Sequence, residues 1–169
     1  MANFAKIDEN NLVINILHLG NEIITDENGV EQESLGQAHL EQHNNWPANQ
    51  WIQTSTYTKK NKHLSGDHTR AFRGNGAAKG YTWFPEKNIF MPPKLYPSWV
   101  LNETDARWQS PIGEQPTRDT YDIHTHFYRW NETNTTWDLL SYSDEGIPVD
   151  ANDPRPADVF GIPWYIWTQ

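Results

Sequence analysis

The chain has 169 residues, a net charge of −9 and no cysteine. This length fits one domain with an appended arm, and the lack of cysteine excludes disulfides, thiolate metal sites and cysteine nucleophiles. The negative charge argues against general binding to nucleic-acid phosphates, and no apolar run reaches the roughly 20 residues that cross a bilayer. The first residues lack the apolar stretch of a secretory signal, so we expect synthesis and assembly in a cytoplasm.

The first half of the chain predicts a hairpin, a helix and a further strand. Residues 4–19 read as two strands joined by an Asp-Asn turn, and the return strand is apolar enough to be central or covered on both faces. His18 within it is interpreted as a packed histidine, because nothing beside it would share a metal. Residues 31–43 predict the one helix, weakened by Gly36, and residues 51–57 predict a strand.

A basic segment follows the predicted strand. Because it lies in an acidic chain, one interpretation is a loop that meets an acidic partner surface or the acidic remainder of a neighbouring copy. A hydrated loop with a local charge imbalance is the alternative, and the sequence leaves both open. Its glycines do not match a phosphate-binding loop. Six of the thirteen basic residues lie here: Lys59, Lys60, Lys62, Arg70, Arg73 and Lys79.

Three aromatic repeats dominate the second half. Residues 81–90, 99–108 and 128–137 align without gaps, and each reads as a hairpin, with aromatic or β-branched runs on either side of a polar turn. Prolines between the first two repeats make that connection stiff and extended, and residues 121–128 predict the strand that leads into the third.

The end of the chain changes in composition. Residues 141–158 are rich in Asp, Pro, Gly and Ser and predict an extended linker, whereas residues 159–167 are apolar and rich in tryptophan. We expect this arm to bury its rings on its own sheet or, preferentially, on a neighbouring subunit. The sequence thus predicts a β-rich hairpin domain with one helix over residues 1–140, and a Pro-rich linker with an apolar C-terminal arm over residues 141–169.

Reactive chemistry has few candidates. Asp122, His124 and His126 share one face of a predicted strand, but neighbouring positions on a flat strand diverge, so they are weak metal candidates. No paired carboxylates or nucleophile-elbow pattern indicates an enzyme, and no cofactor is expected. The predicted fold is mainly β (α+β): an antiparallel sheet of repeated aromatic hairpins with one short helix and an extended C-terminal arm.

The run GYTWFPEKNIFMPPKLYPSWVLNETDARWQSP, followed by a Tyr-Arg-Trp-Asn-Glu-Thr hairpin, resembles small virion proteins of marine tailed bacteriophages, in particular the cyanophage type. The opening FAKIDENNLVINILHL, the acidic helix and the WIQTS strand follow in the same order, so the resemblance covers roughly residues 4–140. It implies a structural virion protein and transfers no catalytic residue.

Two functional hypotheses follow. The first is a non-enzymatic subunit that binds other virion proteins in a symmetric multi-copy assembly, as a capsid decoration or a tail, baseplate or fibre-attachment subunit. The second is a carbohydrate-binding module that stacks host surface sugars on Trp83, Trp99, Trp108, Trp130 or Trp137. For the first, the interface candidates are Trp83, Tyr96, Trp99, Trp108, Trp130, Trp137, Phe160, Trp164, Tyr165, Trp167 and the basic residues Lys59, Lys60, Lys62, Arg70 and Arg73.

Overall fold

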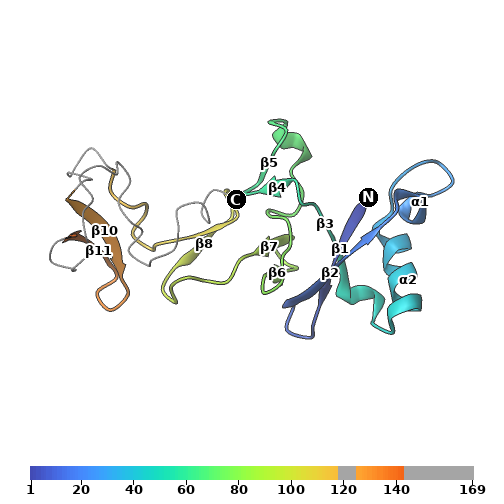
Figure 1. Ribbon diagram of the computed structural model, residues 1–169, viewed down its shortest axis with the longest axis horizontal. Helices are drawn as coiled ribbons and strands as arrows, with labels where there is room; N and C mark the ends of the chain where they lie inside the picture. Colours follow the sequence, from blue (N-terminus) through green and yellow to red (C-terminus); the bar gives the residue numbers. More distant parts are fainter. Residues whose placement is uncertain (118–124, 143–169) are drawn as a thin grey trace. The chain divides into compact units, whose positions relative to one another are not determined.

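The computed structural model describes residues 1–117 and 125–142, and over these residues the protein is mainly β, with antiparallel strand pairs and one helix longer than a single turn (Figure 1). The predicted fold class is therefore confirmed, while the C-terminal arm lies outside the described residues. The described residues form two compact units. The first unit comprises residues 1–95 and 100–108, and the described residues of the second are 96–99, 109–117 and 125–142.

A three-stranded antiparallel sheet forms the base of the first unit. Its strands are β1 (Ala2–Ile7), β2 (Val13–Leu19) and β3 (Trp51–Thr54), in the order β2-β1-β3. The predicted first hairpin is confirmed, but β2 is an edge strand and β1 is the central one. The apolar character of β2 has another cause: both faces of the sheet are covered, so residues pointing either way meet apolar neighbours.

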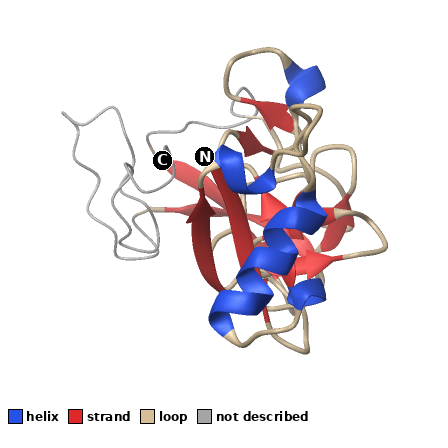
Figure 2. Cartoon of the chain, turned by 90° about the vertical axis from the view of Figure 1, so that its right-hand side faces the viewer, coloured by secondary structure: helices blue, strands red, loops and turns tan. Residues whose placement is uncertain are grey.

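The two faces carry separate cores. Helices α1 (Asn21–Ile24) and α2 (Glu33–Asn44) lie against one face, with α2 crossing in front of the strands in Figure 2. Successive strand residues point to opposite faces, so neighbours in β1 enter different cores. On the helix side the buried residues are Ala2, Phe4, Leu19, Ile24, Leu40 and Trp51; on the other side they are Ala5, Ile7, Val13, Ile52, Trp83 and Phe90.

Gly36 allows α2 to approach the sheet closely. A Cβ atom built at this position would lie 2.3 Å from Cζ of Phe4, a side chain with no exposed surface. Glycine lowers helix propensity by about 1 kcal/mol relative to alanine. Glycine is nevertheless required here, because any larger residue would displace the ring of Phe4 from the core.

Side chains cover the outer edge of β3. The backbone N–H of Gln53 donates to Oε1 of Glu33 at 2.7 Å, and its carbonyl accepts from Nη1 of Arg73, also at 2.7 Å. Arg73 and Glu33 form a bidentate ion pair, with a second Nη–Oε distance of 2.8 Å. Further along the same edge, the Gln37 amide donates to the carbonyl of Trp51. These groups occupy the positions that a fourth strand would take, which protects this edge from pairing with another chain.

The three repeats form three hairpins with the same turn geometry. In each, the residue at the eighth position of the repeat is left-handed: Asn88 with φ 54°, Ala106 with φ 44° and Thr135 with φ 52°. The repeat read from the sequence is thus confirmed as a repeated backbone conformation. The strands are β6 (Thr82–Phe84) and β7 (Ile89–Met91), β8 (Val100–Asn102) and β9 (Arg107–Gln109), and β10 (His126–Asn131) and β11 (Thr136–Ser141).

The predicted basic loop contains regular structure. It includes a two-residue hairpin, β4 (Thr58–Lys59) and β5 (Lys62–His63), and the turn of 3₁₀ helix η2 (His68–Arg70). A similar turn, η1 (Ala48–Gln50), precedes β3. The β4–β5 turn has φ 54° at Lys60 and φ 57° at Asn61. Two consecutive positive φ values define the tight hairpin turn whose twist matches that of its strands.

Asn75 fixes the β4–β5 hairpin to the two hairpins that follow it in unit one. Its buried side chain accepts from the backbone N–H of Lys60 at 2.9 Å and donates to the carbonyls of Phe90 and Ala106, each at 2.8 Å. One amide therefore joins three turns or strands that lie far apart in sequence. Since its polar atoms are satisfied, its burial stabilises the arrangement.

Candidate functional site

The β4–β5 hairpin presents three lysines, and we call residues 58–63 the basic hairpin. Lys59 and Lys62 are directly paired across its two strands, while Lys60 occupies the turn. Like charges at directly opposed positions destabilise a strand pair, and a non-glycine residue is uncommon at positive φ. The local sequence therefore concentrates positive charge at a cost to the stability of the hairpin.

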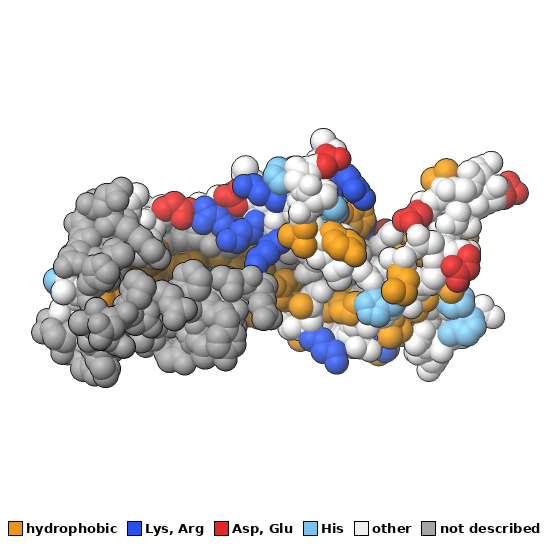
Figure 3. All heavy atoms as spheres, turned by 45° about the horizontal axis from the view of Figure 1, so that its top comes forward, with side chains coloured by type: hydrophobic (Ala, Val, Ile, Leu, Met, Phe, Trp, Pro, Cys, Tyr) orange, Lys and Arg blue, Asp and Glu red, His pale blue; other side chains and the backbone are white. Residues whose placement is uncertain are grey.

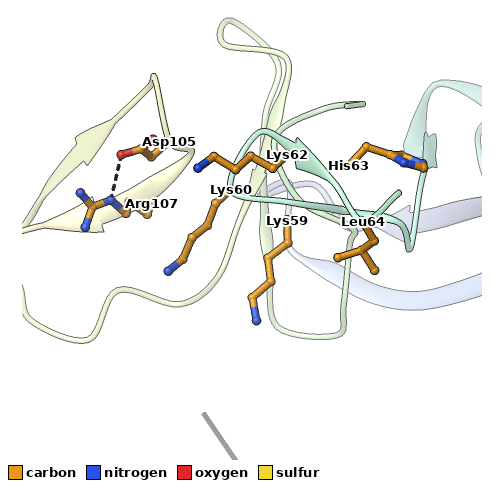
Figure 4. Close-up of a pocket in the computed structure, with 7 residues that line it drawn as sticks. All are labelled: Lys59, Lys60, Lys62, His63, Leu64, Asp105 and Arg107. Atoms are coloured by element: carbon orange, nitrogen blue, oxygen red, sulfur yellow. Dashed lines mark hydrogen bonds and ion pairs between the residues drawn. The ribbon is translucent and has the colours of Figure 1, made fainter. Parts of the chain in front are cut away.

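A hollow of about 390 Å³ lies beside the basic hairpin. In Figure 4 the side chains of Lys59 and Lys60 extend to the same side, Lys62 extends towards the β8–β9 hairpin, and the ring of His63 points away. The lining combines four cationic side chains with one carboxylate, one imidazole and one apolar side chain: Lys59, Lys60, Lys62, His63, Leu64, Asp105 and Arg107.

The second wall of the hollow is held by its own hydrogen bonds. Nε of Arg107 lies 3.2 Å from Oδ2 of Asp105, and the backbone N–H of Asp105 donates to Oδ1 of Asn102. The Asn61 amide also donates to the carbonyls of Glu103 and Thr104, at 2.8 and 2.9 Å. The two hairpins are thus joined at their turns, so the cations are presented on a fixed frame. Such a hollow suits a carboxylate or another anionic group.

The two arginines of the basic segment have different surroundings. Arg73 is held inside the first unit, with a side chain only 13% exposed, by the ion pair with Glu33 and the carbonyl of Gln53. Arg70 is exposed and lines a separate hollow of about 480 Å³, together with Tyr57 and Phe72. Of the two predicted interface arginines, Arg70 is available to a partner, whereas the guanidinium of Arg73 is used within the fold.

The tryptophans of the first unit serve its interior. Trp83 is 7% exposed, and its ring packs at a tilt of 44° against Phe90, its partner across the β6–β7 hairpin, with the ring centroids 4.6 Å apart. Trp108 is partly buried, and its indole N–H donates to the carbonyl of Pro92 at 2.7 Å. Trp83 therefore has no free face on which a sugar ring would stack.

Four rings of the second unit form one cluster. Trp130 and Trp137 face each other across the β10–β11 hairpin with centroids 5.2 Å apart, and Trp99 lies 6.3 and 6.1 Å from them. Tyr96 packs on Trp99 at 5.1 Å. Trp130 is only 4% exposed. We call Tyr96, Trp99, Trp130 and Trp137 the aromatic cluster, and its members other than Trp130 keep partial exposure.

Glu132 anchors the segment 96–99 to this cluster. Its carboxylate accepts from the backbone N–H and the hydroxyl of Ser98 and from the indole N–H of Trp130, each at 2.8 Å. Burial raises the pKa of the Tyr96 hydroxyl; the Glu132 charge adds to this effect and Arg129 opposes it. The phenol of Tyr96 therefore stays protonated at neutral pH.

The weak metal candidates do not form a site among the described residues. His126 begins β10, and its Nδ1 lies 2.8 Å from the hydroxyl of Thr125. Asp122 and His124 lie outside the described residues. Within residues 1–117 and 125–142, no three His, Asp or Glu side chains converge in a way that would hold an ion.

Four predicted interface residues of the C-terminal arm also lie outside the described residues: Phe160, Trp164, Tyr165 and Trp167. His18 was expected to be packed. It is exposed on edge strand β2, and its Nδ1 is hydrogen-bonded to Oδ1 of Asn3.

The sequence did not predict that Asp105 and Arg107 lie beside the lysines. It also did not predict that Asn75 holds the basic hairpin in place or that Glu132 anchors residues 96–99 to the aromatic cluster. Asp105 and Glu132 stand in polar turns, where their residue types are expected for local reasons. Asn75 stands between Gly74 and Gly76, whose close approaches to neighbouring atoms leave no space for a Cβ. This Gly-Asn-Gly run was the one available signal of a tightly packed turn.

Comparison of the chain with protein-family models, curated proteins and solved structures finds no match. No described helix combines the length and the apolar character needed to span a membrane.

Proposed function

We propose that this chain is a non-enzymatic structural component of a tailed-phage virion, which binds other virion proteins and uses the basic hairpin to contact an acidic surface on a partner. The resemblance of residues 4–140 to small virion proteins supplies the setting. The basic hairpin and its hollow form a cationic surface, so the partner surface is expected to be acidic.

The direct pairing of Lys59 with Lys62 carries the proposal. A hairpin selected for stability alone would place opposite charges, or β-branched residues, at this pair. Local choices that oppose the fold are typical of functional positions, where binding compensates for the cost. A carboxylate bound in the hollow adds an attractive charge beside the lysines, which offsets the cost of placing two of them at opposed positions.

The frame around the lysines supports binding to a protein surface. Asn75 fixes the turn at Lys60, and Asn61 joins it to the β8–β9 hairpin, so the backbone needs no rearrangement on binding. The chain as a whole is acidic, with a net charge of −9. A long polyanion such as nucleic acid would be repelled by the remainder of the molecule, whereas a local acidic patch would meet only the basic hairpin.

Two charge-reversal variants test the role of the hairpin. Lys62→Glu replaces the repulsive pair with an attractive one, so we expect a hairpin as stable as before or more stable by roughly 0.2–1 kcal/mol. Binding to a synthetic poly-glutamate peptide, measured by calorimetry at low salt, is expected to fall at least tenfold. Lys79→Glu is the matched control, because it changes the net charge equally at another exposed site. Equal losses in both variants would show that only net charge matters.

The virion setting is tested in particles. Wild-type and Lys79→Glu chains are expected in gradient-purified particles at constant stoichiometry, detected by mass spectrometry, and Lys62→Glu at a reduced level. Cross-linking through Lys59, Lys60 or Lys62 is expected to capture acidic segments of another virion protein. Absence of the wild-type chain from purified particles would contradict the proposal.

Host glycan binding is the alternative outcome of the same experiments. It requires rings with an open face, and the candidates with partial exposure are Trp99, Trp108 and Trp137. A tryptophan fluorescence change on adding host polysaccharide, with no response to virion proteins, would favour it.

A further inference from the structure

The outer edge of β2 carries backbone groups that point away from the sheet. The backbone N–H and C=O of Gln53 bond to side chains on the outside of β3, so they point away from β1. Phe4 is the residue of β1 opposite Gln53, and its backbone N–H and C=O therefore point towards β2. Phe4 is paired with Leu17. The backbone groups of Leu17 therefore point towards β1. Successive residues of a strand direct their N–H and C=O to alternate sides, so those of Ile16 and His18 point away from the sheet.

One end of this edge is already occupied. The N–H of Val13 donates to the carbonyl of Tyr81 at 2.7 Å, and its carbonyl accepts from the N–H of Gly80 at 2.9 Å. Beyond Val13, no described residue bonds to the outward groups of Ile16 or His18. Two donors and two acceptors are therefore available in a row.

This edge lacks the usual protection against pairing. Free edges are normally blunted by charged residues, by proline or by covering side chains, as Glu33 and Arg73 cover the edge of β3. Residues 14–19 are Ile-Asn-Ile-Leu-His-Leu and contain no charge and no proline. Ile14 and His18 are exposed, the former by 37%. In the sheet order β2-β1-β3, β2 lies at the edge beside β1.

We propose that β2 is a self-association edge, where two copies of the chain pair antiparallel about a two-fold axis at Leu17. Ile16 of each copy then lies opposite His18 of the other, and all four outward groups of each strand form hydrogen bonds. The two three-stranded sheets become one sheet of six strands in the order β3-β1-β2-β2-β1-β3. A two-fold axis makes the contact self-complementary, so the assembly closes as a dimer.

The occupied end of the edge selects this register. Pairing about Leu17 aligns Asn15 with Leu19 of the other copy and ends before Val13. Pairing about Ile16 would place Leu19 of the other copy opposite Val13, where Gly80 and Tyr81 already form hydrogen bonds. A second copy is favoured as the occupant because an uncharged strand brings no like charges face to face with itself.

A proline substitution tests the edge. Proline is tolerated in an edge strand where its missing N–H would face solvent, so His18→Pro is expected to leave the isolated subunit folded, as judged by circular dichroism. The dimer loses one hydrogen bond from each copy and meets two proline rings, so its Kd is expected to rise about tenfold or more. His18→Ala is the matched control, because it also loses the contact with Asn3 but retains the backbone donor.

Sedimentation velocity over a concentration series gives the readout. The proposal predicts a reversible dimer for the wild type and His18→Ala, and a shift towards monomer for His18→Pro. A wild type that stays monomeric at all concentrations overturns it, as does a dimer unaffected by His18→Pro. If the β2 edge bound only a different protein and never a second copy of this chain, the proposal would also be overturned.

Disulfide trapping tests the register independently of stability. The chain has no cysteine, so one introduced thiol has no competitor. Leu17 pairs with itself at a position without hydrogen bonds, where Cα atoms approach to about 4.5 Å, within the range of a disulfide. Mild oxidation is expected to cross-link Leu17→Cys into a covalent dimer and to leave Ile16→Cys largely monomeric, because its two copies lie diagonally. Equal cross-linking of both variants, or of neither, overturns the register.

Discussion

Asn75 and Arg73 each satisfy backbone groups that the short strands of the first unit leave without partners. Asn75 does so in the interior, between three turns or strands, and Arg73 does so at the edge of β3. Both are polar residues of a glycine-rich segment that would be read as solvated from sequence alone. Their importance comes from the cost of leaving buried carbonyl and amide groups unsatisfied.

Replacing the Asn75 amide with a carboxylate tests this cost. In Asn75→Asp the carbonyls of Phe90 and Ala106 lose their donor and face negative charge. We expect a loss of about 2–4 kcal/mol in the free energy of unfolding, measured by urea denaturation followed by circular dichroism. Asn88→Asp is the matched control: it is exposed, and its carboxylate still accepts from Nε of Arg73. If the two variants lose equal stability, the buried amide has no special role.

At the scale of elements, one turn conformation is used three times with different residues. Asn88, Ala106 and Thr135 all have positive φ at the eighth position of their repeats. Asparagine tolerates this region because its side chain bonds locally, whereas a β-branched threonine is strained there. The third hairpin therefore contains a residue that is less suited to its turn than the residue in the first.

Transferring the residue of the first hairpin to the third is expected to relieve the strain. Thr135→Asn should raise the free energy of unfolding by roughly 0.5–1 kcal/mol, a fraction of the left-handed penalty. The gain is measurable as a shift in Tm detected by tryptophan fluorescence, since Trp130 and Trp137 flank this turn. Thr133→Asn, an exposed change in the same turn without positive φ, is expected to be neutral. A gain for Thr133→Asn as large as that for Thr135→Asn would indicate a general effect of asparagine.

At the scale of the whole molecule, charge separates the two proposed contact surfaces. The chain carries a net charge of −9, so two copies repel each other at long range, while β2 itself contributes no charge. The basic hairpin instead attracts acidic partners against this background. On the face shown in Figure 3, several lysine and arginine side chains lie near one another.

The two surfaces are therefore expected to respond to salt in opposite directions. Raising the ionic strength from about 0.05 to about 0.5 M shortens the screening length several-fold, which weakens binding of poly-glutamate to the basic hairpin. The same change reduces repulsion between two acidic copies, so dimerisation through β2 is expected to strengthen or stay constant. Calorimetry and sedimentation velocity measure the two effects on one sample. A parallel loss of both would contradict the assignment of an uncharged edge to the dimer.

The sequence by itself determined the first hairpin, helix α2 and the three repeated aromatic hairpins, because these depend on patterns within ten or so residues: alternating apolar residues, turn-forming residues and their spacing. Only the tertiary structure placed β1 rather than β2 in the centre, moved Arg73 from the expected surface into a pair with Glu33, and brought Asp105 and Arg107 beside the lysines. Each of these depends on residues tens of positions apart. Local propensity carries no information about such pairings, since they are selected by which arrangement satisfies the buried polar groups and fills both cores.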